Sequence, residues 1–435
     1  MNLLQLLTAE RLHVMPGPIP ADRSAFEADF DRIIFSQPFR SLQNKTQVVP
    51  LPDHDFVHTR LTHSLEVSSV GRSLGRMVGQ WLCQQYPELP QAGCSAFDIS
   101  AIVAAACLAH DLGNPPFGHA GEAAISDYFQ RLSLSDFTEA EAKDLTSFEG
   151  NAQGFRLLIT RKDLKPTLAV LGAFTKYPCA SAFEGKNTAL KSQKKYGYFQ
   201  SESVDFQNLA QRLGLASSGL AFVRHPLSFL VEAADDLCYL LIDLEDAVGM
   251  RKIDIGQFEV CMAEVLGEAM PAGPNYAART PVERAGLLRA MGINLLVQQS
   301  VQAFQTHHEA ILSGKLEQPL TALIPAAQAL DEISRFSVRH IYQSEEVLFL
   351  QATGYEILPE LIYMFYEAQE AVFHQRKKAA PKFRNLCGLL PYEVMDWDLE
   401  LTPYLRIRRL LDFIAGLSDR KAMDVYAKIK GIRIR

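Results

Sequence analysis

The chain has 435 residues, 48% of them hydrophobic and 21% charged, which is enough to bury a large globular core as one domain or two. No stretch approaches the roughly 18 apolar residues of a membrane span, and the N-terminus lacks the features of a secretory signal, so we expect no membrane association. A net charge of -7 gives no support for nucleic-acid binding, although it does not exclude a small anionic substrate. The seven cysteines lack Cys-x-x-Cys spacing, which disfavours a disulfide framework or a zinc ribbon and favours the cytoplasm.

Apolar residues recur at helical spacing along almost the whole chain, which predicts an all-α protein. In the first predicted helix, the expected buried face consists of His63, Val67, Val70, Leu74, Met77 and Trp81. In the second, it consists of Ile99, Val103, Ala106 and His110. Pro115 and Pro116 are expected to end this second helix, which would place Asp111 in its last turn.

A third predicted helix carries an acidic residue where an apolar one is expected. Asp235 lies on the same face as Val231, Cys238 and Ile242. Asp236 is its immediate rival, but the helical phase favours Asp235. Three helices are therefore expected to aim His63, His110 with Asp111, and Asp235 into the interior.

The rest of the chain contains few strand signals. Residues 195–204 fit a short hairpin or an extended loop, and 130–147 and 180–220 fit surface excursions. Helical spacing returns over 285–375, and Pro381 marks a break before a final helical segment at about 403–430.

Buried charges are costly unless they are paired or bind a metal ion. Each inward polar side chain alone fits a hydrogen-bonded core residue, but two imidazoles and two carboxylates together predict a metal site. This mixed nitrogen and oxygen set suits a divalent Mn, Mg, Fe, Co or Ni ion with open water positions, and the absence of thiolates disfavours structural zinc.

A second pair, His119 and Glu122, follows the helix break at one-turn spacing. A carboxylate that orients an imidazole makes it a proton donor, which is what a leaving alkoxide needs. The alternative is that His119 only caps a helix beginning at Ala120, although histidine is not a favoured cap.

Five segments in order resemble one known family: HTRLTHSLEV, AHDLGNPPFGHAGE, FEGNAQGFRLL, LGAFTKYP and EAADDLCYLLIDLED. They are similar to the bacterial deoxyguanosine triphosphate triphosphohydrolases, which are HD-domain metal-dependent phosphohydrolases. The resemblance implies an all-α HD-domain fold with a C-terminal helical extension, and hydrolysis of a dNTP to deoxynucleoside and inorganic triphosphate. It also implies one unit over 1–435, with a catalytic core at 55–250 and a helical region at 260–435 that shapes the pocket and oligomer contacts.

The resemblance assigns roles to individual residues. Metal ligands are implied at His63, His110, Asp111 and Asp235, and a catalytic pair at His119 and Glu122. Substrate contacts are implied at Gln47 (sugar 3′-hydroxyl), Arg60 (phosphates), Lys176 and Tyr177 (triphosphate), Tyr239 and Asp243 (sugar and phosphate), and Tyr342 (sugar 2′ position). Gly150, Asn151 and Gln153 are expected to support the site from below.

The favoured substrate is dGTP, with other dNTPs left open, and the implied partners are a possible nucleotide effector and copies of the same chain, with a hexamer favoured. Binding of single-stranded DNA stays open without support from the net charge. Two alternatives remain: an HD phosphohydrolase of nucleoside monophosphates, cyclic nucleotides or alarmones, and a nucleotide or DNA sensor with vestigial catalysis. Gln47, Arg60 and Lys176 argue against the first, and the intact ligand set argues against the second.

Overall fold

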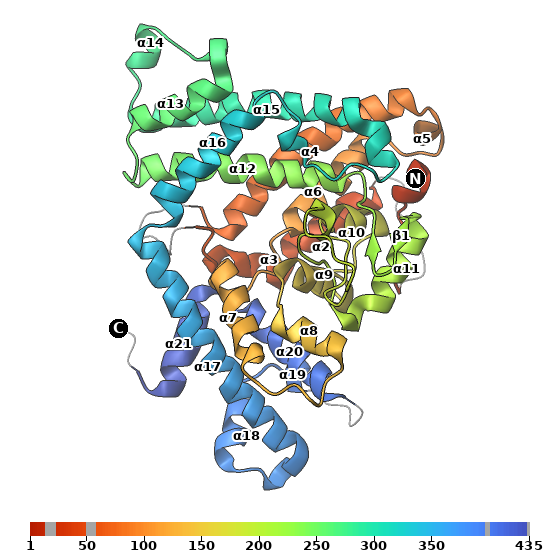
Figure 1. The fold of residues 1–435 in the computed structure, drawn as a ribbon, viewed down its shortest axis with the longest axis vertical. Coiled ribbons are helices and arrows are strands. Elements are labelled where there is room, and N and C mark those ends of the chain that lie inside the picture. Colours follow the sequence, from red (N-terminus) through yellow and green to blue (C-terminus); the bar gives the residue numbers. More distant parts are fainter. Residues whose placement is uncertain (14–22, 49–57, 396–400, 433–435) are drawn as a thin grey trace.

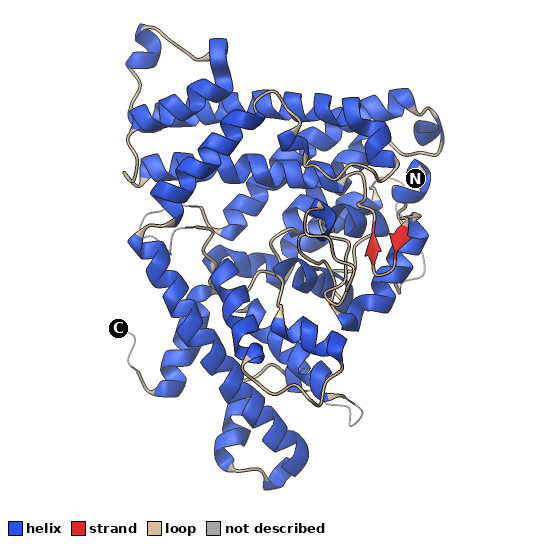
Figure 2. Cartoon of the chain, viewed as in Figure 1, coloured by secondary structure: helices blue, strands red, loops and turns tan. Residues whose placement is uncertain are grey.

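The computed structural model describes residues 1–13, 23–48, 58–395 and 401–432, and almost all of its regular structure is helical (Figures 1 and 2). This confirms the predicted all-α class. The strands of the described residues are β1 (Ser217–Ser218) and β2 (Ala221–Phe222), which form a short antiparallel hairpin. None of the helices among these residues is both long and apolar enough to cross a bilayer.

The α-helices of the first half are α1 (Leu3–Leu6), α2 (Ala25–Phe35), α3 (Gln37–Ser41), α4 (Arg60–Gln85), α5 (Glu88–Gln91), α6 (Ala96–Ala109), α7 (Gly118–Gln130), α8 (Glu139–Thr146), α9 (Gly150–Thr160), α10 (Leu168–Phe174), α11 (Ser203–Leu213) and α12 (Ser228–Gly249). Those of the second half are α13 (Ile255–Leu266), α14 (Pro274–Ala277), α15 (Pro281–Leu312), α16 (Ala327–Ser337), α17 (Glu345–Gln375), α18 (Pro381–Cys387), α19 (Tyr392–Met395), α20 (Pro403–Gly416) and α21 (Asp419–Lys430). Short 3₁₀ or π turns are η1 (Leu42–Asn44), η2 (Lys191–Gln193), η3 (Gln200–Glu202), η4 (Gly267–Ala269), η5 (Leu320–Ala322), η6 (Val338–Tyr342) and η7 (Arg376–Lys378).

Helices α4 and α6 pack closely enough to bring their histidines together. A capping box at Thr59 starts α4, and another at Ser95 starts α6. The two helices meet at glycines of α4: a Cβ added at Gly75 would lie 3.0 Å from the Cα of Ser100, and one at Gly79 would lie 3.0 Å from that of Ala96. Because the contacts run in opposite directions along the two helices, the start of α4 lies beside the end of α6.

The apolar core has two main parts. The larger cluster joins α4, α6, α10 and α12 to α15 and α16, and α12 runs beside α15 in Figure 1. The second cluster lies between α7, α17 and α20, around Phe129, Leu358, Leu361 and Leu410. The division into 55–250 and 260–435 stays a prediction.

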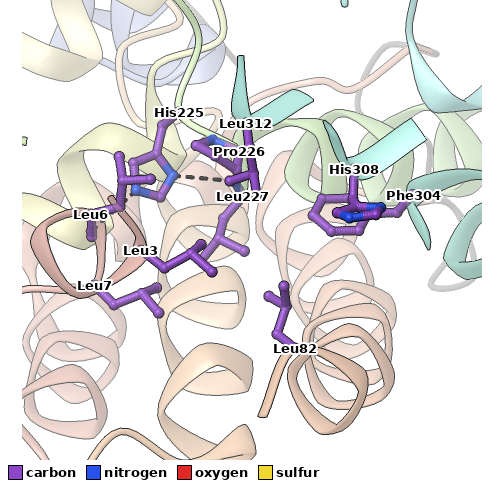
Figure 3. Close-up of a pocket in the computed structure, with 10 residues that line it drawn as sticks. All are labelled: Leu3, Leu6, Leu7, Leu82, His225, Pro226, Leu227, Phe304, His308 and Leu312. Atoms are coloured by element: carbon purple, nitrogen blue, oxygen red, sulfur yellow. Dashed lines mark hydrogen bonds between the residues drawn. The ribbon is translucent and has the colours of Figure 1, made fainter. Parts of the chain in front are cut away.

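The N-terminal helix α1 closes a small apolar cavity whose other walls come from α4, α15 and residues 225–227, just before α12 (Figure 3). His225 lies in its wall, where Nε2 donates to the carbonyl of Leu6 at 3.2 Å and Nδ1 accepts the N–H of Leu227 at 3.1 Å. Burial lowers the pKa of His225 to about 4, so the ring is neutral with both nitrogens paired. We regard this cavity as structural.

Two local predictions were wrong. Helix α6 ends at Ala109, and Asp111 lies in the turn beyond it, because the chain tightens into turn bonds before it reaches the prolines. Met77 is 37% exposed, since the buried face of this long helix drifts to Val78 and Leu82. Of the two alternatives for residues 195–204, the loop is the one observed: residues 195–199 are irregular and lead into η3 and the start of α11.

Candidate active site

The four predicted metal ligands converge from three helices. His63 lies in the first turn of α4, His110 is the C-cap of α6 with Asp111 next to it, and Asp235 lies on α12. Ligand atoms of His63, His110 and Asp111 all lie within 4.8 Å of one another. Oδ1 of Asp235 lies 3.3 Å from Nε2 of His63 and 3.5 Å from Nε2 of His110. Two imidazole nitrogens and two carboxylates therefore face a common point, which fits a divalent ion.

Hydrogen bonds orient these ligands. Nδ1 of His110 donates to the carbonyl of Cys107 at 2.7 Å, which leaves Nε2 free to bind a metal. Asp111 accepts from Nη1 of Arg60 at 2.8 Å and from the side-chain amide of Asn114. Burial raises the pKa of Asp111, but Arg60 and the neighbouring imidazoles outweigh it and hold the pKa below its usual value. The carboxylate is therefore charged at neutral pH.

Asp235 and Asp236 occupy different environments. Burial raises the pKa of Asp235, but His110, His63 and Lys176 lower it further than burial raises it. Asp236 instead accepts from the hydroxyl of Thr321 at 3.1 Å, and burial raises its pKa to about 6. The helical phase that favoured Asp235 over Asp236 agrees with this geometry.

His119 and Glu122 form a hydrogen-bonded pair on the first turns of α7. Nδ1 of His119 donates to Oε2 of Glu122 at 2.7 Å, while the histidine side chain is 81% exposed and presents its other nitrogen outward. The helix begins at Gly118 after Phe117 as N-cap, so the alternative that His119 caps a helix starting at Ala120 is wrong.

Glu122 is buried and fixed from below. Its Oε1 accepts the N–H of Gly150 at 2.7 Å, and a Cβ at Gly150 would lie only 2.2 Å from Oδ1 of Asn114. Burial raises the pKa of Glu122, but the hydrogen bond from His119 and the charge of Lys195 outweigh it and lower the pKa. The charged carboxylate is therefore held in place to orient the imidazole of His119.

The predicted phosphate-binding residues surround the ligand cluster. Arg60 lies against the start of α7, since a Cβ at Gly118 would be 2.6 Å from its Nη2. Nζ of Lys176 lies 4.0 Å from Oδ2 of Asp235, and 5.9 Å from the ring centre of Tyr177.

Gln47 lies on the segment that pairs with the start of α4. Thr46 forms a bridge with Thr59, and the N–H of Arg60 donates to the carbonyl of Lys45 at 3.1 Å. Oε1 of Gln47 is buried without a hydrogen-bond partner among the described residues. A buried acceptor of this kind is costly unless a ligand supplies the donor.

Three further predicted residues meet farther along the same face of α12: Tyr239 and Asp243 lie one and two turns after Asp235, and Tyr342 ends η6. The rings of Tyr239 and Tyr342 stack at 5.5 Å, and the hydroxyl of Tyr342 donates to Oδ2 of Asp243 at 2.8 Å. Burial raises the pKa of Asp243 to about 8, although the hydrogen bond from Tyr342 opposes this.

Two lysines of the loop at 191–195 were not predicted as site residues. Nζ of Lys195 lies 3.1 Å from Oε1 of Glu149 and 3.8 Å from Oε2 of Glu122, and Nζ of Lys191 lies 3.3 Å from Oε1 of Glu232. The cluster KSQKK was visible in the sequence, but its charges alone fitted solvated surface equally well.

Comparisons with known proteins agree with this geometry. Residues 60–156, which include three of the four ligands and the His119–Glu122 pair, match the family model described as the HD domain. A deoxyguanosinetriphosphate triphosphohydrolase-like protein of Synechocystis sp. is 38% identical, with 95% of both chains covered. One of Pseudomonas aeruginosa is 36% identical over 99% of both chains, and the deoxyguanosinetriphosphate triphosphohydrolase of Salmonella typhimurium is 31% identical over 94% of both.

HD domains bind divalent metal ions, and the converging His, His and Asp ligands fit such an ion. The protein is thus a metal-dependent phosphohydrolase. By sequence, coverage and site, the chain belongs to the deoxyguanosinetriphosphate triphosphohydrolase family of HD-domain proteins.

Proposed function

We propose that the protein hydrolyses deoxynucleoside triphosphates, dGTP first among them, to deoxynucleoside and inorganic triphosphate. The observation that carries the proposal is that the His119–Glu122 pair lies beside the cluster of two histidines and two carboxylates. Arg60 lies between them, because it donates to Asp111 and also lies against the start of α7. The names of the similar proteins support the same substrate.

His63, His110, Asp111 and Asp235 would hold the metal ion, with Mn, Mg, Fe, Co or Ni compatible with these ligands. When bound, such an ion lowers the pKa of water and polarises phosphoryl oxygens.

His119 is the proposed proton donor to the departing 5′-oxygen. Its outward nitrogen is open to a substrate, and Glu122 orients the ring by accepting the hydrogen bond from Nδ1. Arg60 and Lys176 would offset the charge of the triphosphate, with Tyr177 beside Lys176.

The sugar contacts are proposed at four residues. Gln47 has an unpaired buried oxygen that can accept the 3′-hydroxyl. Tyr239, Asp243 and Tyr342 form one packed unit, and the ring of Tyr342 would exclude a 2′-hydroxyl by its bulk. This unit would favour deoxyribose over ribose.

We also propose that the protein forms a closed homo-oligomer, with a hexamer favoured, and that it has a possible nucleotide effector. The seven free thiols support a cytoplasmic location. Light scattering with and without nucleotide tests assembly, and a monomer at every concentration would contradict it. Binding of single-stranded DNA is not proposed, because the net charge of -7 does not support it.

A metal analysis with a nucleotide panel separates this function from its alternatives. The panel consists of the four dNTPs, GTP, dGMP and a cyclic nucleotide, each assayed with and without added divalent metal. We expect turnover of dNTPs and release of triphosphate. Turnover of dGMP or the cyclic nucleotide alone would indicate another HD phosphohydrolase, and nucleotide binding without turnover at full metal occupancy would indicate a sensor.

A further inference from the structure

A buried carboxylate near the C-terminal end of the chain reaches two segments of the proposed active site. Asp419 is 1% exposed and begins α21. Its Oδ2 accepts the backbone N–H of Thr46 at 2.8 Å, and its Oδ1 accepts that of Phe117 at 2.9 Å. Thr46 precedes Gln47, and Phe117 lies two residues before His119. One side chain thus ties the proposed sugar-reading segment to the start of the proposed proton-donor helix.

Lys45 makes a second tie at the same place. It is almost fully buried, and its Nζ donates to the carbonyls of Asn114 and Ala415, each at 2.6 Å. Asn114 in turn donates its side-chain amide to Asp111. Burial lowers the pKa of Lys45 to about 7, and the charge of Asp419 opposes this. The end of α20 is therefore linked to the loop that carries a metal ligand.

The backbone at the start of α7 needs such support. Phe117 has a φ of 64°, a left-handed conformation that non-glycine residues adopt rarely and keep only where their surroundings enforce it. Its side chain packs against α17, where a Cβ at Gly354 would lie 3.0 Å from the Cβ of Phe117. Asp419 holds the N–H of the same residue. Both contacts therefore hold the residue from which α7 starts, two positions before His119.

The usual role of an aspartate in the first turn of a helix does not explain Asp419. Such residues cap the helix or interact with its dipole. Here Ser418 is the N-cap, and its hydroxyl accepts the N–H of Lys421 at 3.2 Å. Both oxygens of Asp419 face other segments instead, so capping and bridging can be separated by mutation.

We propose that Asp419, assisted by Lys45, is a positioning residue that fixes the segment of Gln47 relative to His119. A substrate bound between these two segments can then contact Gln47 with its sugar and His119 with its 5′-oxygen at the same time. This inference rests on the proposed function, because Gln47 and His119 have these roles only there.

The test compares Asp419→Asn with the matched control Ser418→Ala, which removes the cap of α21 and leaves both bridging bonds intact. An asparagine has one acceptor oxygen, so one of the two N–H groups loses its partner and faces a donor. We expect faster hydrogen–deuterium exchange over residues 43–48 and 112–120 in Asp419→Asn but not in Ser418→Ala. We also expect kcat/KM for dGTP to fall about 10- to 100-fold in Asp419→Asn at full metal occupancy, and to stay near wild type in the control.

Equal exchange or equal kcat/KM in the two variants would overturn the proposal. If Asp419→Asn does not fold, Lys45→Met takes its place, because it keeps the buried stem and removes the ammonium group with its two donated bonds. Unchanged exchange over residues 112–120 in that variant would also overturn the proposal. Hydrogen–deuterium exchange needs no substrate, so it tests the positioning role on its own. A wild-type protein that does not hydrolyse dGTP would refute the proposed function, and the exchange result would still decide the positioning role.

Discussion

Replacing Glu122 with glutamine tests the proposed proton donor, because it removes a charge and keeps the shape. Oε2 of Glu122 accepts from Nδ1 of His119 and Oε1 accepts from Gly150, both at 2.7 Å. A hydrogen bond to a charged group contributes about 1 to 1.5 kcal/mol more than a neutral one, which corresponds to about tenfold in rate. Because an amide has one acceptor oxygen, His119 or Gly150 also loses its partner. We therefore expect kcat to fall about 10- to 100-fold.

The assay measures kcat and KM from the release of inorganic triphosphate, with metal content determined on the same samples. Glu149→Gln is the matched control: Glu149 is also buried and also contacts Lys195, but it makes no contact with His119. We expect the control to lose less than about threefold, since no hydrogen bond to His119 is removed. A wild-type rate in Glu122→Gln, an equal loss in both variants, or loss of the metal in Glu122→Gln would refute the assigned role.

Three further predictions follow from the geometry. Asp235→Asn should lose the bound ion and almost all turnover while Asp236→Asn keeps the ion, because only Asp235 lies between the two histidines; full metal occupancy in Asp235→Asn would contradict the ligand assignment. His119→Ala should keep the ion and lose about 10² to 10⁴ in rate, whereas loss of the ion would make His119 a ligand. The folded pKa of Asp243 is raised to about 8, so the folded state holds this proton more tightly than the unfolded chain. Its contribution to the free energy of unfolding is full below about pH 4 and is lost as the pH rises to about 8. In denaturant titrations at several pH values, Asp243→Asn should therefore show a smaller fall in the free energy of unfolding between about pH 4 and pH 8. An equal fall in the variant and the wild type would contradict this.

Helical periodicity predicted much of the fold and the centre of the site. His63, His110 and Asp235 each stood on an apolar face, and such a face turns inward, so the spacing predicted that all three point into the interior. The structure adds that they meet at one point. The predicted end of α6 was placed too late, because hydrogen-bonded turns after Ala109 end the helix before Pro115 and Pro116 are reached. The ligand position of Asp111 survived this error, since it depends on adjacency to His110.

The supports of the site could not be predicted in this way. Asp419 and Thr46 lie 373 residues apart, and no periodicity connects them. Lys195 belongs to an irregular loop, where charge spacing does not fix direction. Gln47, Tyr239, Asp243 and Tyr342 were identified from the resemblance to a family, because a single polar residue carries no pattern of its own. The structure brings the last three together, and their contact with substrate stays a prediction.

The position of bond cleavage tests the proposed function most directly. The purified enzyme is incubated with dGTP and a divalent metal in ¹⁸O-labelled water, and the products are identified by mass spectrometry. We predict unlabelled deoxyguanosine and inorganic triphosphate that carries one ¹⁸O atom, because in the proposed reaction water attacks the α-phosphorus while His119 protonates the leaving 5′-oxygen. Release of dGMP with pyrophosphate, or of dGDP with phosphate, would contradict a triphosphohydrolase, and label in the nucleoside hydroxyl would contradict attack at the α-phosphorus.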